Sequence, residues 1–221
     1  MSSAASIRVR GLIFDLDGTL LDSLAEIGTA MNVALERRGL PPHAIADYRI
    51  MIGEGVEVLA RRAAPALPEN DLRALVDEYR AEYQRQGHSL SRPYAGIEPL
   101  LHALAAQRLP MAVLSNKRDD FTRALVAHHF HSVPFIDVRG ERVAVPRKPH
   151  PQAALELAAL LQLAPVDIGF VGDTAVDMNT ARNAGMQAIG VSWGFRPEEL
   201  SAAGARLTLA TPADLLPLLA H

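Results

Sequence analysis

Cysteine is absent from the sequence of 221 residues, so disulfide bonds, thiolate nucleophiles and cysteine-based metal sites are excluded. Long apolar runs are absent too. No segment reaches the roughly 20 consecutive apolar residues that span a bilayer, and we expect no membrane partner. The first ten residues lack the apolar run and cleavage site of a signal peptide. We expect a cytoplasmic protein whose first five or so residues form a frayed tail.

An excess of basic residues is also missing. The formal net charge is −3, and acidic and basic residues are interspersed along the chain. This balance lacks the basic footprint of a nucleic-acid-binding protein, so we expect no nucleic-acid partner. We find no internal repeat and no low-complexity segment. Apolar residues make up 49% of the chain, which predicts a packed fold rather than disorder.

After residue 89, short apolar segments alternate with amphipathic segments. We predict strands in this part of the chain at residues 111–114, 135–138, 168–171 and 188–191, with helices between them. An earlier strand is predicted at residues 9–14. This alternation is typical of an α/β fold, a Rossmann-like core with a parallel sheet flanked by helices. The length of the chain allows such a core and a smaller second domain.

Residues 22–88 show helical patterns without an intervening strand. Ser23 and Glu26 form a capping-box pattern at the start of the first helix, and Asn70 or Asp71 is expected to cap the longest one. An insert of about 65 residues is too long for an ordinary connection of roughly 2–6 residues between a strand and a helix. We therefore predict an all-helical cap domain at residues 22–88 and a catalytic core at residues 1–21 and 89–221.

Polar residues stand at the ends of three predicted strands. Asp15, Ser115 and Asp173 each follow an apolar segment directly. In open parallel sheets, ligands bind at the carboxyl ends of the strands. We expect these three side chains to share one site at that edge of the sheet.

Four segments carry a family resemblance. Two acids two residues apart, taken alone, are common in solvated turns. The string D-L-D-G-T-L at residues 15–20, after an apolar strand, resembles motif I of the haloacid dehalogenase superfamily. Ser115-Asn116, Lys148 and the string G-D-T-A-V-D at residues 172–177 are similar to the later motifs of that superfamily, in the same order.

The resemblance implies a phosphoryl-transfer site. Asp15 is expected to be the nucleophile that becomes phosphorylated, and Asp17 the general acid and base. Ser115 and Asn116 are expected to hold phosphate oxygens through hydroxyl and backbone N–H groups, although such a pair also simply caps helices. Lys148 is expected to neutralise both nucleophile and phosphate, where otherwise it would be an ordinary surface lysine.

The resemblance also implies a Mg²⁺ cofactor. Mg²⁺ prefers a few oxygen ligands, and Asp15, Asp173 and the backbone carbonyl of Asp17 supply them. Asp177 lies one helical turn after Asp173 and could serve the outer shell of the metal. Its alternative role is that of an acid in the first turn of a helix, favoured by the helix dipole.

Within the superfamily, the chain is similar to the phosphoglycolate phosphatase branch. Ser115-Asn116-Lys117 is similar to the T-N-K string of that branch, and residues 147–151 match its R-K-P-x-P run. The acid at Asp17 disfavours dehalogenation. We expect Mg²⁺-dependent hydrolysis of a small phosphorylated metabolite. A phosphomutase on the same core and a non-enzymatic phospho-acceptor module are the alternatives, and the predicted cap argues against the second.

Substrate choice is expected to belong to the cap. Gly53-Glu54-Gly55 could dip a flexible loop into the site, and Arg61 and Arg62 could meet a substrate carboxylate. The alternative is a plain turn followed by a solvated helix face. We expect the cap to open and close about hinges at residues 20–23 and 88–94. The sequence leaves open whether the protein is a monomer or a homodimer.

Overall fold

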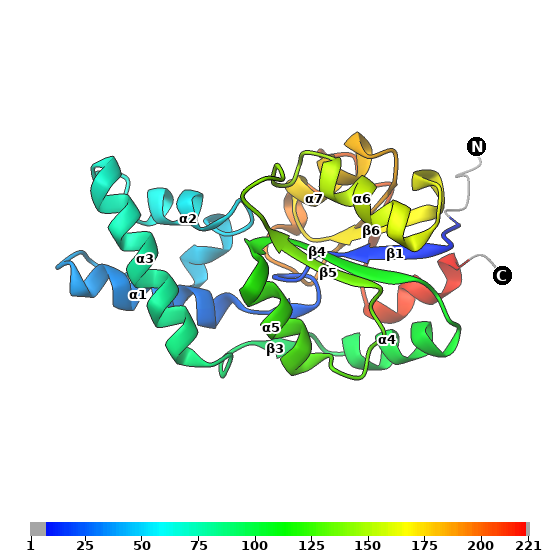
Figure 1. Cartoon of the computed structure of the whole chain (residues 1–221), viewed down its shortest axis with the longest axis horizontal. Helices are drawn as coiled ribbons and strands as arrows, with labels where there is room; N and C mark the ends of the chain where they lie inside the picture. The colour runs from blue at the N-terminus through cyan, green and yellow to red at the C-terminus, as the bar shows by residue number, and fades with distance from the viewer. Residues whose placement is uncertain (1–7, 220–221) are drawn as a thin grey trace.

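The computed structural model describes residues 8–219, and the frayed tail expected at residues 1–5 lies outside this range. Figure 1 shows a sheet with helices on both faces and, beside it, a separate group of helices formed by the early part of the chain. Near the two ends of the described range, Val9 pairs with Leu219 in an isolated parallel bridge. The α/β fold class predicted from the sequence is confirmed.

Within residues 8–219, six strands form one parallel sheet in the order β5-β4-β1-β6-β7-β8. The strands are β1 (Gly11–Phe14), β4 (Met111–Arg118), β5 (Asp137–Glu141), β6 (Ile168–Gly172), β7 (Gln187–Val191) and β8 (Leu207–Leu209). The first strand of the chain thus lies in the middle of the sheet. Its neighbours β4 and β6 come from parts of the chain about a hundred residues or more away.

Helices cover both faces of the sheet (Figure 1). They are α4 (Ile97–Ala106), α5 (Asp119–His129), α6 (Gln152–Leu161) and α7 (Ala175–Asn183), with short 3₁₀ helices at Pro165–Asp167, Pro197–Glu199 and Pro212–Leu218. Leu12 and Phe14 of β1 pack in one apolar cluster with α4 and α5, while Ile13 packs in a second with α6 and α7. Because both faces are covered, β1 is apolar at successive positions rather than at alternate ones.

The cap is a compact helical group with its own apolar cluster. It contains α1 (Leu24–Arg37), a 3₁₀ helix (Ile45–Ile50), α2 (Val56–Ala63) and α3 (Glu69–Gln86). Tyr48, Leu75 and Tyr83 are fully buried in this cluster. Two short antiparallel strands, β2 (Leu21–Asp22) and β3 (Arg92–Pro93), join the cap to the core. The expected hinges coincide with these strands, while the division into two domains stays a prediction.

Several expected element boundaries are wrong. β4 extends to Arg118, so Ser115 and Asn116 lie within the strand rather than after it. The reason is that β4 leaves its pairing with β1 after Val113 but meets β5 again at Arg118. β5 lies at residues 137–141 rather than 135–138. The helix α3 begins at Glu69, because the carbonyl of Pro68 accepts its first backbone hydrogen bond.

The capping box expected at Ser23 and Glu26 is also wrong. Ser23 occupies the cap position of α1, but its hydroxyl donates to Asp17 Oδ1 at 2.6 Å instead of accepting from the helix backbone. Glu26 is fully buried and accepts a hydrogen bond from Ser91 in the second linker. Both side chains therefore tie α1 to the linker region rather than closing the end of the helix.

We predict that Leu12→Ala lowers the free energy of unfolding of the core by about 2–5 kcal/mol, because it opens a cavity in the central strand. The midpoint of urea denaturation, followed by circular dichroism, measures this loss. Val143→Ala is the matched control, because Val143 is fully exposed, and it should change stability by less than about 0.5 kcal/mol. Equal effects of the two substitutions would contradict the assigned core.

Candidate active site

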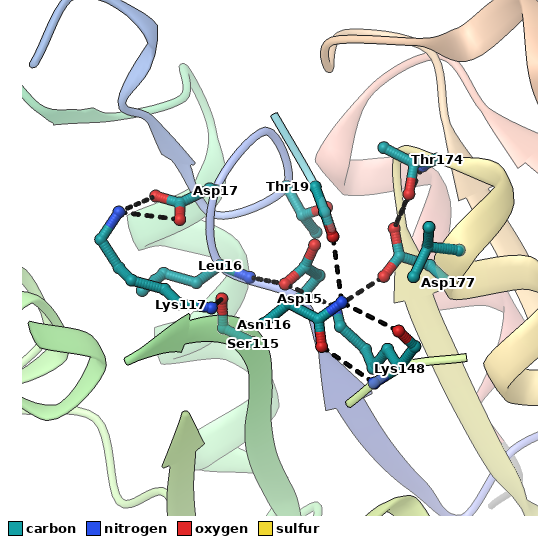
Figure 2. Close-up of polar contacts among 12 residues, drawn as sticks. Asp15, Leu16, Asp17, Thr19, Ser115, Asn116, Lys117, Lys148, Thr174 and Asp177 are labelled. Atoms are coloured by element: carbon teal, nitrogen blue, oxygen red, sulfur yellow. Dashed lines mark hydrogen bonds and ion pairs between the residues drawn. The ribbon is translucent and has the colours of Figure 1, made fainter. Parts of the chain in front are cut away.

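The polar residues expected at one edge of the sheet do meet there (Figure 2). Asp15 follows β1, Asp173 follows β6, and Ser115 lies in β4 just beyond its pairing with β1. Lys148 reaches the same place from the loop between β5 and α6. All four residues are almost closed to solvent. The topology of the sheet thus brings together residues that are far apart in the sequence.

Lys148 lies between two carboxylates. Its Nζ atom is 2.8 Å from Oδ1 of Asp15 and 2.7 Å from Oδ1 of Asp177. The backbone of Lys148 is fixed by Asn116, whose Oδ1 accepts from Lys148 N at 2.9 Å and whose Nδ2 donates to Lys148 O at 3.0 Å. The side chain of Asn116 therefore positions the lysine loop. Its backbone N–H and the Ser115 hydroxyl are the groups expected to contact phosphate.

Asp15, Asp173 and Asp177 form a buried acidic cluster. One carboxylate oxygen from each lies within 4.8 Å of the others. Burial raises the pKa of Asp15 well above its usual range, with Asp177 adding to the effect and Lys148 opposing it. Burial and the charge of Asp177 likewise raise the pKa of Asp173 to about 7. Burial lowers the pKa of Lys148, but Asp15 and Asp177 outweigh it, so the pKa lies above its ordinary value.

The donor set fits a hard divalent cation. Three carboxylates carry a charge of −3 and Lys148 carries +1, so the fully ionised cluster has a charge of −2. A dication would neutralise this excess, and carboxylate oxygens are the ligands that Mg²⁺ and Ca²⁺ prefer. The pKa values of Asp15 and Asp173 are raised mainly by burial, and the neighbouring negative charge of Asp177 raises them further.

Asp177 both caps the first turn of α7 and binds Lys148. Its Oδ2 accepts from the backbone N of Thr174 at 3.1 Å and from the Thr174 hydroxyl at 2.8 Å, which forms a capping box for α7. Its Oδ1 accepts from Lys148. The expectation that Asp177 serves the outer shell of a metal stays a prediction.

Two glycines allow the approach to Asp173. Its Oδ2 accepts from the backbone N of Phe195 at 2.7 Å, and its Oδ1 accepts from the Thr19 hydroxyl at 3.1 Å. A Cβ at Gly18 would lie 2.2 Å from Asp173 Oδ2, and one at Gly194 would lie 2.2 Å from Asp173 Cβ. Gly18 also has a φ of +84°, which favours glycine. The loops after β1 and β7 can enclose this carboxylate only with glycine at both positions.

Asp17 lies on the other side of Asp15 from the acidic cluster (Figure 2). Lys117 Nζ donates to both of its carboxylate oxygens, at 2.9 and 3.1 Å, and Ser23 adds a third hydrogen bond. Burial lowers the pKa of the Lys117 ammonium, but the charge of Asp17 outweighs burial and raises it above its ordinary value. Sequence reasoning missed this ion pair, although the T-N-K similarity had already drawn attention to Lys117.

A cavity lies between the cap and the core beside these residues. The volume within which the centre of a water molecule fits is about 60 Å³. This is enough for a few waters or a small organic molecule. Its walls include Asp15, Asp17, Ile27, Ile52, Gly53, Gly55, Val56, Leu59, Tyr79, Arg80, Ser115, Asn116, Lys117, Arg118, Phe121, Thr174 and Phe195. Residues of the cap such as Tyr79 and Arg80 also line this cavity. The sequence did not predict their place there, because the apolar spacing of α3 indicates only which side of the helix is buried.

The three cap residues expected to set specificity lie elsewhere. Glu54, Arg61 and Arg62 are not among the residues that line the cavity, although Gly53 and Gly55 are. Arg62 pairs with Glu54 and donates to the carbonyl of Met51, within the cap. Arg61 pairs with Glu69 on the surface. Their contribution to substrate specificity stays a prediction. The contacts do not favour it, because both arginines already pair with acids of the cap.

Polar contacts hold the cap against the core around the cavity. Arg49 of the cap donates to the carbonyls of Gly194 at 2.8 Å and Phe195 at 3.2 Å. Asn116 of the core donates to the carbonyl of Gly53 at 3.0 Å. Arg147, next to Lys148, forms an ion pair with Glu57 of α2. These contacts join residues 49, 53 and 57 to the core around the cavity.

The sequence matches the family described as haloacid dehalogenase-like hydrolase over residues 12–191, and the chain belongs to this family. The resemblance drawn from its motifs is confirmed. Among its relatives, a phosphoglycolate phosphatase of Yersinia pestis is 34% identical over 217 residues, covering 95% of this chain and 92% of that protein. A phosphoglycolate phosphatase of Xylella fastidiosa strain Temecula1 is 32% identical over 190 residues, covering 86% of this chain and 83% of that protein.

Solved structures agree with this assignment. A predicted phosphoglycolate phosphatase from Haemophilus somnus 129pt superposes with a TM-score of 0.88 at 27% identity, over 95% of this chain and 97% of that one. A protein of Lactobacillus delbrueckii subsp. bulgaricus superposes with a TM-score of 0.91 at 28% identity, over 97% and 100% of the two chains. Across residues 8–219, no helix combines the length and the apolar character that crossing a membrane requires.

We predict that Mg²⁺ stabilises this protein through Asp173. At 100 times the dissociation constant, a bound ligand adds about 2.7 kcal/mol, which corresponds to roughly 5–10 °C in Tm for a chain of this size. Asp173→Asn should remove this response, because it removes one charge of the cluster while keeping an acceptor for Phe195 N. Differential scanning calorimetry with and without Mg²⁺ measures the shift.

Asp71→Asn is the matched control, because Asp71 is an exposed acid on α3. It should keep the full response to Mg²⁺. An unchanged shift in Asp173→Asn would show that the ion binds without this carboxylate.

Proposed function

We propose that this protein is a Mg²⁺-dependent phosphatase that hydrolyses a small phosphate monoester through a phosphorylated Asp15. The observation that carries the proposal is the position of Lys148, which contacts both Asp15 and Asp177. These two acids cluster with Asp173, and Asp15 also lines the cavity. Phosphoglycolate is the first substrate to test, because the relatives bear that name. The expected cytoplasmic location and the choice between monomer and homodimer stay predictions.

In the first step, a carboxylate oxygen of Asp15 attacks phosphorus and the bond to the leaving oxygen breaks. Lys148 and the backbone N–H of Leu16 both bind Oδ1 of Asp15, which leaves Oδ2 as the more nucleophilic oxygen. Asp17 donates a proton to the leaving alkoxide. The products of this step are the free alcohol and an aspartyl phosphate on Asp15.

In the second step, water attacks phosphorus of the aspartyl phosphate. Asp17, now ionised, takes the proton of the water, and the bond between Asp15 and phosphorus breaks. Inorganic phosphate leaves and both carboxyl groups return to their starting state. Lys148, the Ser115 hydroxyl and the backbone N–H of Asn116 bind the phosphate oxygens throughout. A bound Mg²⁺, held by Asp15, Asp173 and the carbonyl of Asp17, would supply positive charge to the phosphate oxygens.

We predict that Asp15→Asn lowers phosphate release by at least about 1,000-fold, because the amide is not a nucleophile toward phosphorus. Release is measured with Mg²⁺ on a panel of phosphoglycolate, sugar phosphates, nucleoside monophosphates and pyrophosphate, and ranked by kcat/KM. The surface variant Asp71→Asn should keep full activity. If Asp15→Asn retained a tenth of the rate, another group would be the nucleophile. An isomerised sugar phosphate without free phosphate would instead indicate a phosphomutase.

We also propose that residues 22–88 form a cap domain that opens to admit substrate and closes to exclude water, turning about β2 and β3. Among residues 8–219, the chain passes between the helices of residues 22–88 and the sheet only at these two strands. The contacts of Arg49, Asn116 and Arg147 described above favour the closed arrangement. Lids of this kind move on μs–ms timescales.

We predict that Arg49→Met raises KM about 3- to 10-fold, since it removes hydrogen bonds that exist only when the cap is closed, a loss of roughly 0.7–1.4 kcal/mol. The midpoint of urea denaturation should stay the same, because Arg49 is exposed and contributes nothing to either apolar cluster. Arg73 is an exposed arginine on α3, so Arg73→Met is the control for the loss of one positive charge from the cap. Unchanged KM in Arg49→Met would remove this contact from the closing mechanism.

A further inference from the structure

A buried lysine lies on each side of the segment that carries Asp15 and Asp17, and one of the two, Lys117, lines the cavity. Figure 2 shows Lys148 approaching this loop beside the acidic cluster and Lys117 approaching it from the opposite side, next to Asp17. The side chain of Lys148 is 2% exposed and that of Lys117 is 8% exposed. The mechanism above uses Lys148 for the phosphate and gives Lys117 no partner in the substrate.

The arginines of the cavity wall are already paired with acids that have no part in the reaction. Arg80 of α3 forms an ion pair with Glu57 at 3.0 Å. Arg118 binds Asp120 through two of its nitrogen atoms and lies over the ring of Phe121. Neither arginine needs a substrate to neutralise it.

Lys117 differs from these arginines in its partner. Its ammonium donates two hydrogen bonds to Asp17, and it lies 4.6 Å from the centre of the Tyr83 ring. An ammonium has three protons. Among the residues at 8–219, no acceptor other than Asp17 lies within hydrogen-bond distance of Lys117 Nζ, so one proton is left for a ligand. The surrounding wall is mostly apolar, formed by side chains such as Ile52, Leu59 and Phe121.

We propose that Lys117 binds a carboxylate on the leaving group of the substrate, so that each lysine holds one negatively charged end of the same small molecule. This inference rests on the proposed phosphatase function and assigns Lys117 as the residue that selects a substrate with a carboxylate on its leaving group. Asp17 lies between the two lysines, next to the bond that breaks.

The distances fit a phosphorylated 2-hydroxy acid. A general acid acts on a leaving oxygen at about 2.6–3.2 Å, which places that oxygen beside Asp17. In a 2-hydroxy acid, the carboxylate carbon is two bonds from this oxygen, about 2.5 Å away. Lys117 Nζ is itself 2.9 Å from the Asp17 carboxylate. A carboxylate this close to the leaving oxygen can therefore reach the remaining proton of Lys117.

Lys117→Met, assayed on two substrates, tests the proposal. Phosphoglycolate carries the carboxylate, and 2-hydroxyethyl phosphate has a neutral hydroxymethyl group in its place. We expect the unsubstituted enzyme to prefer phosphoglycolate in kcat/KM by about 10- to 100-fold, the range for a hydrogen bond between charged groups. Lys117→Met should slow both substrates by disturbing Asp17 and should also reduce the preference to about threefold or less. Lys117→Arg should keep most of it.

Arg118→Met and Arg80→Met are the matched variants, because they remove the other cations of the cavity wall. Both should keep the preference for phosphoglycolate. A preference that survives in Lys117→Met, or that disappears in Arg118→Met instead, would overturn the proposal and leave Lys117 as a positioning residue for Asp17.

Calorimetric titration of Asp15→Asn protein separates binding from turnover. In the presence of Mg²⁺, Asp15→Asn should bind phosphoglycolate more tightly than 2-hydroxyethyl phosphate, and Asp15→Asn/Lys117→Met should bind the two equally. Equal binding of the two compounds by Asp15→Asn would contradict the role of Lys117. If the unsubstituted protein hydrolysed no monoester at all, the proposed function would fail, yet the titration would still report on Lys117.

Discussion

The ammonium of Lys148 lies between Asp15 and Asp177 in a place almost closed to water, and the surrounding structure is arranged around this pair of ion pairs. Charges buried without a partner cost several kcal/mol each, so a third carboxylate beside this pair of ion pairs is unfavourable by itself. Asp173 is that third carboxylate, and burial together with the charge of Asp177 raises its pKa to about 7. The same excess of negative charge creates affinity for a divalent ion. The fold accepts a local destabilisation here, and binding of metal and phosphate at the carboxyl ends of the strands relieves it.

The scaffold holds this cluster by constraints on the backbone rather than by extra charges. β1 and β6 are neighbours in the sheet, so the acids that follow them meet without any further device. Gly18 and Gly194 let two loops close on Asp173, and a Cβ on either would displace it. The side-chain amide of Asn116 fixes the backbone of Lys148 by accepting through its oxygen and donating through its nitrogen, which ties the position of the cation to β4. Asp15, Asp173 and Lys148 are thus placed by elements of the core.

The sequence predicted the parts of this arrangement that depend on local pattern. Apolar runs predicted the strands. The acids that directly follow two of these runs predicted that Asp15 and Asp173 meet at the carboxyl edge of the sheet. It could not give contacts between side chains that are far apart along the chain. The ion pair of Asp17 with Lys117 joins residues separated by 100 positions. The expected capping box at Ser23 failed for a different reason. A serine followed three residues later by a glutamate has the right spacing, but the hydroxyl donates instead to Asp17, six residues earlier in the chain.

The hydrogen bond between Ser23 and Asp17 has a mechanical consequence. Ser23 is the residue from which α1, the first helix of the cap, begins, and its hydroxyl lies 2.6 Å from the Asp17 carboxylate. Lys117, the other partner of Asp17, lies beneath the ring of Tyr83 in α3. Two groups that fix Asp17 therefore belong to the cap or contact it. If the cap turns about β2 as proposed above, Ser23 would move relative to β1 and this hydrogen bond would lengthen. The contact between Asp15 and Lys148 joins two residues of the core and would be kept. The proposed motion would then act first on the carboxylate that transfers the proton.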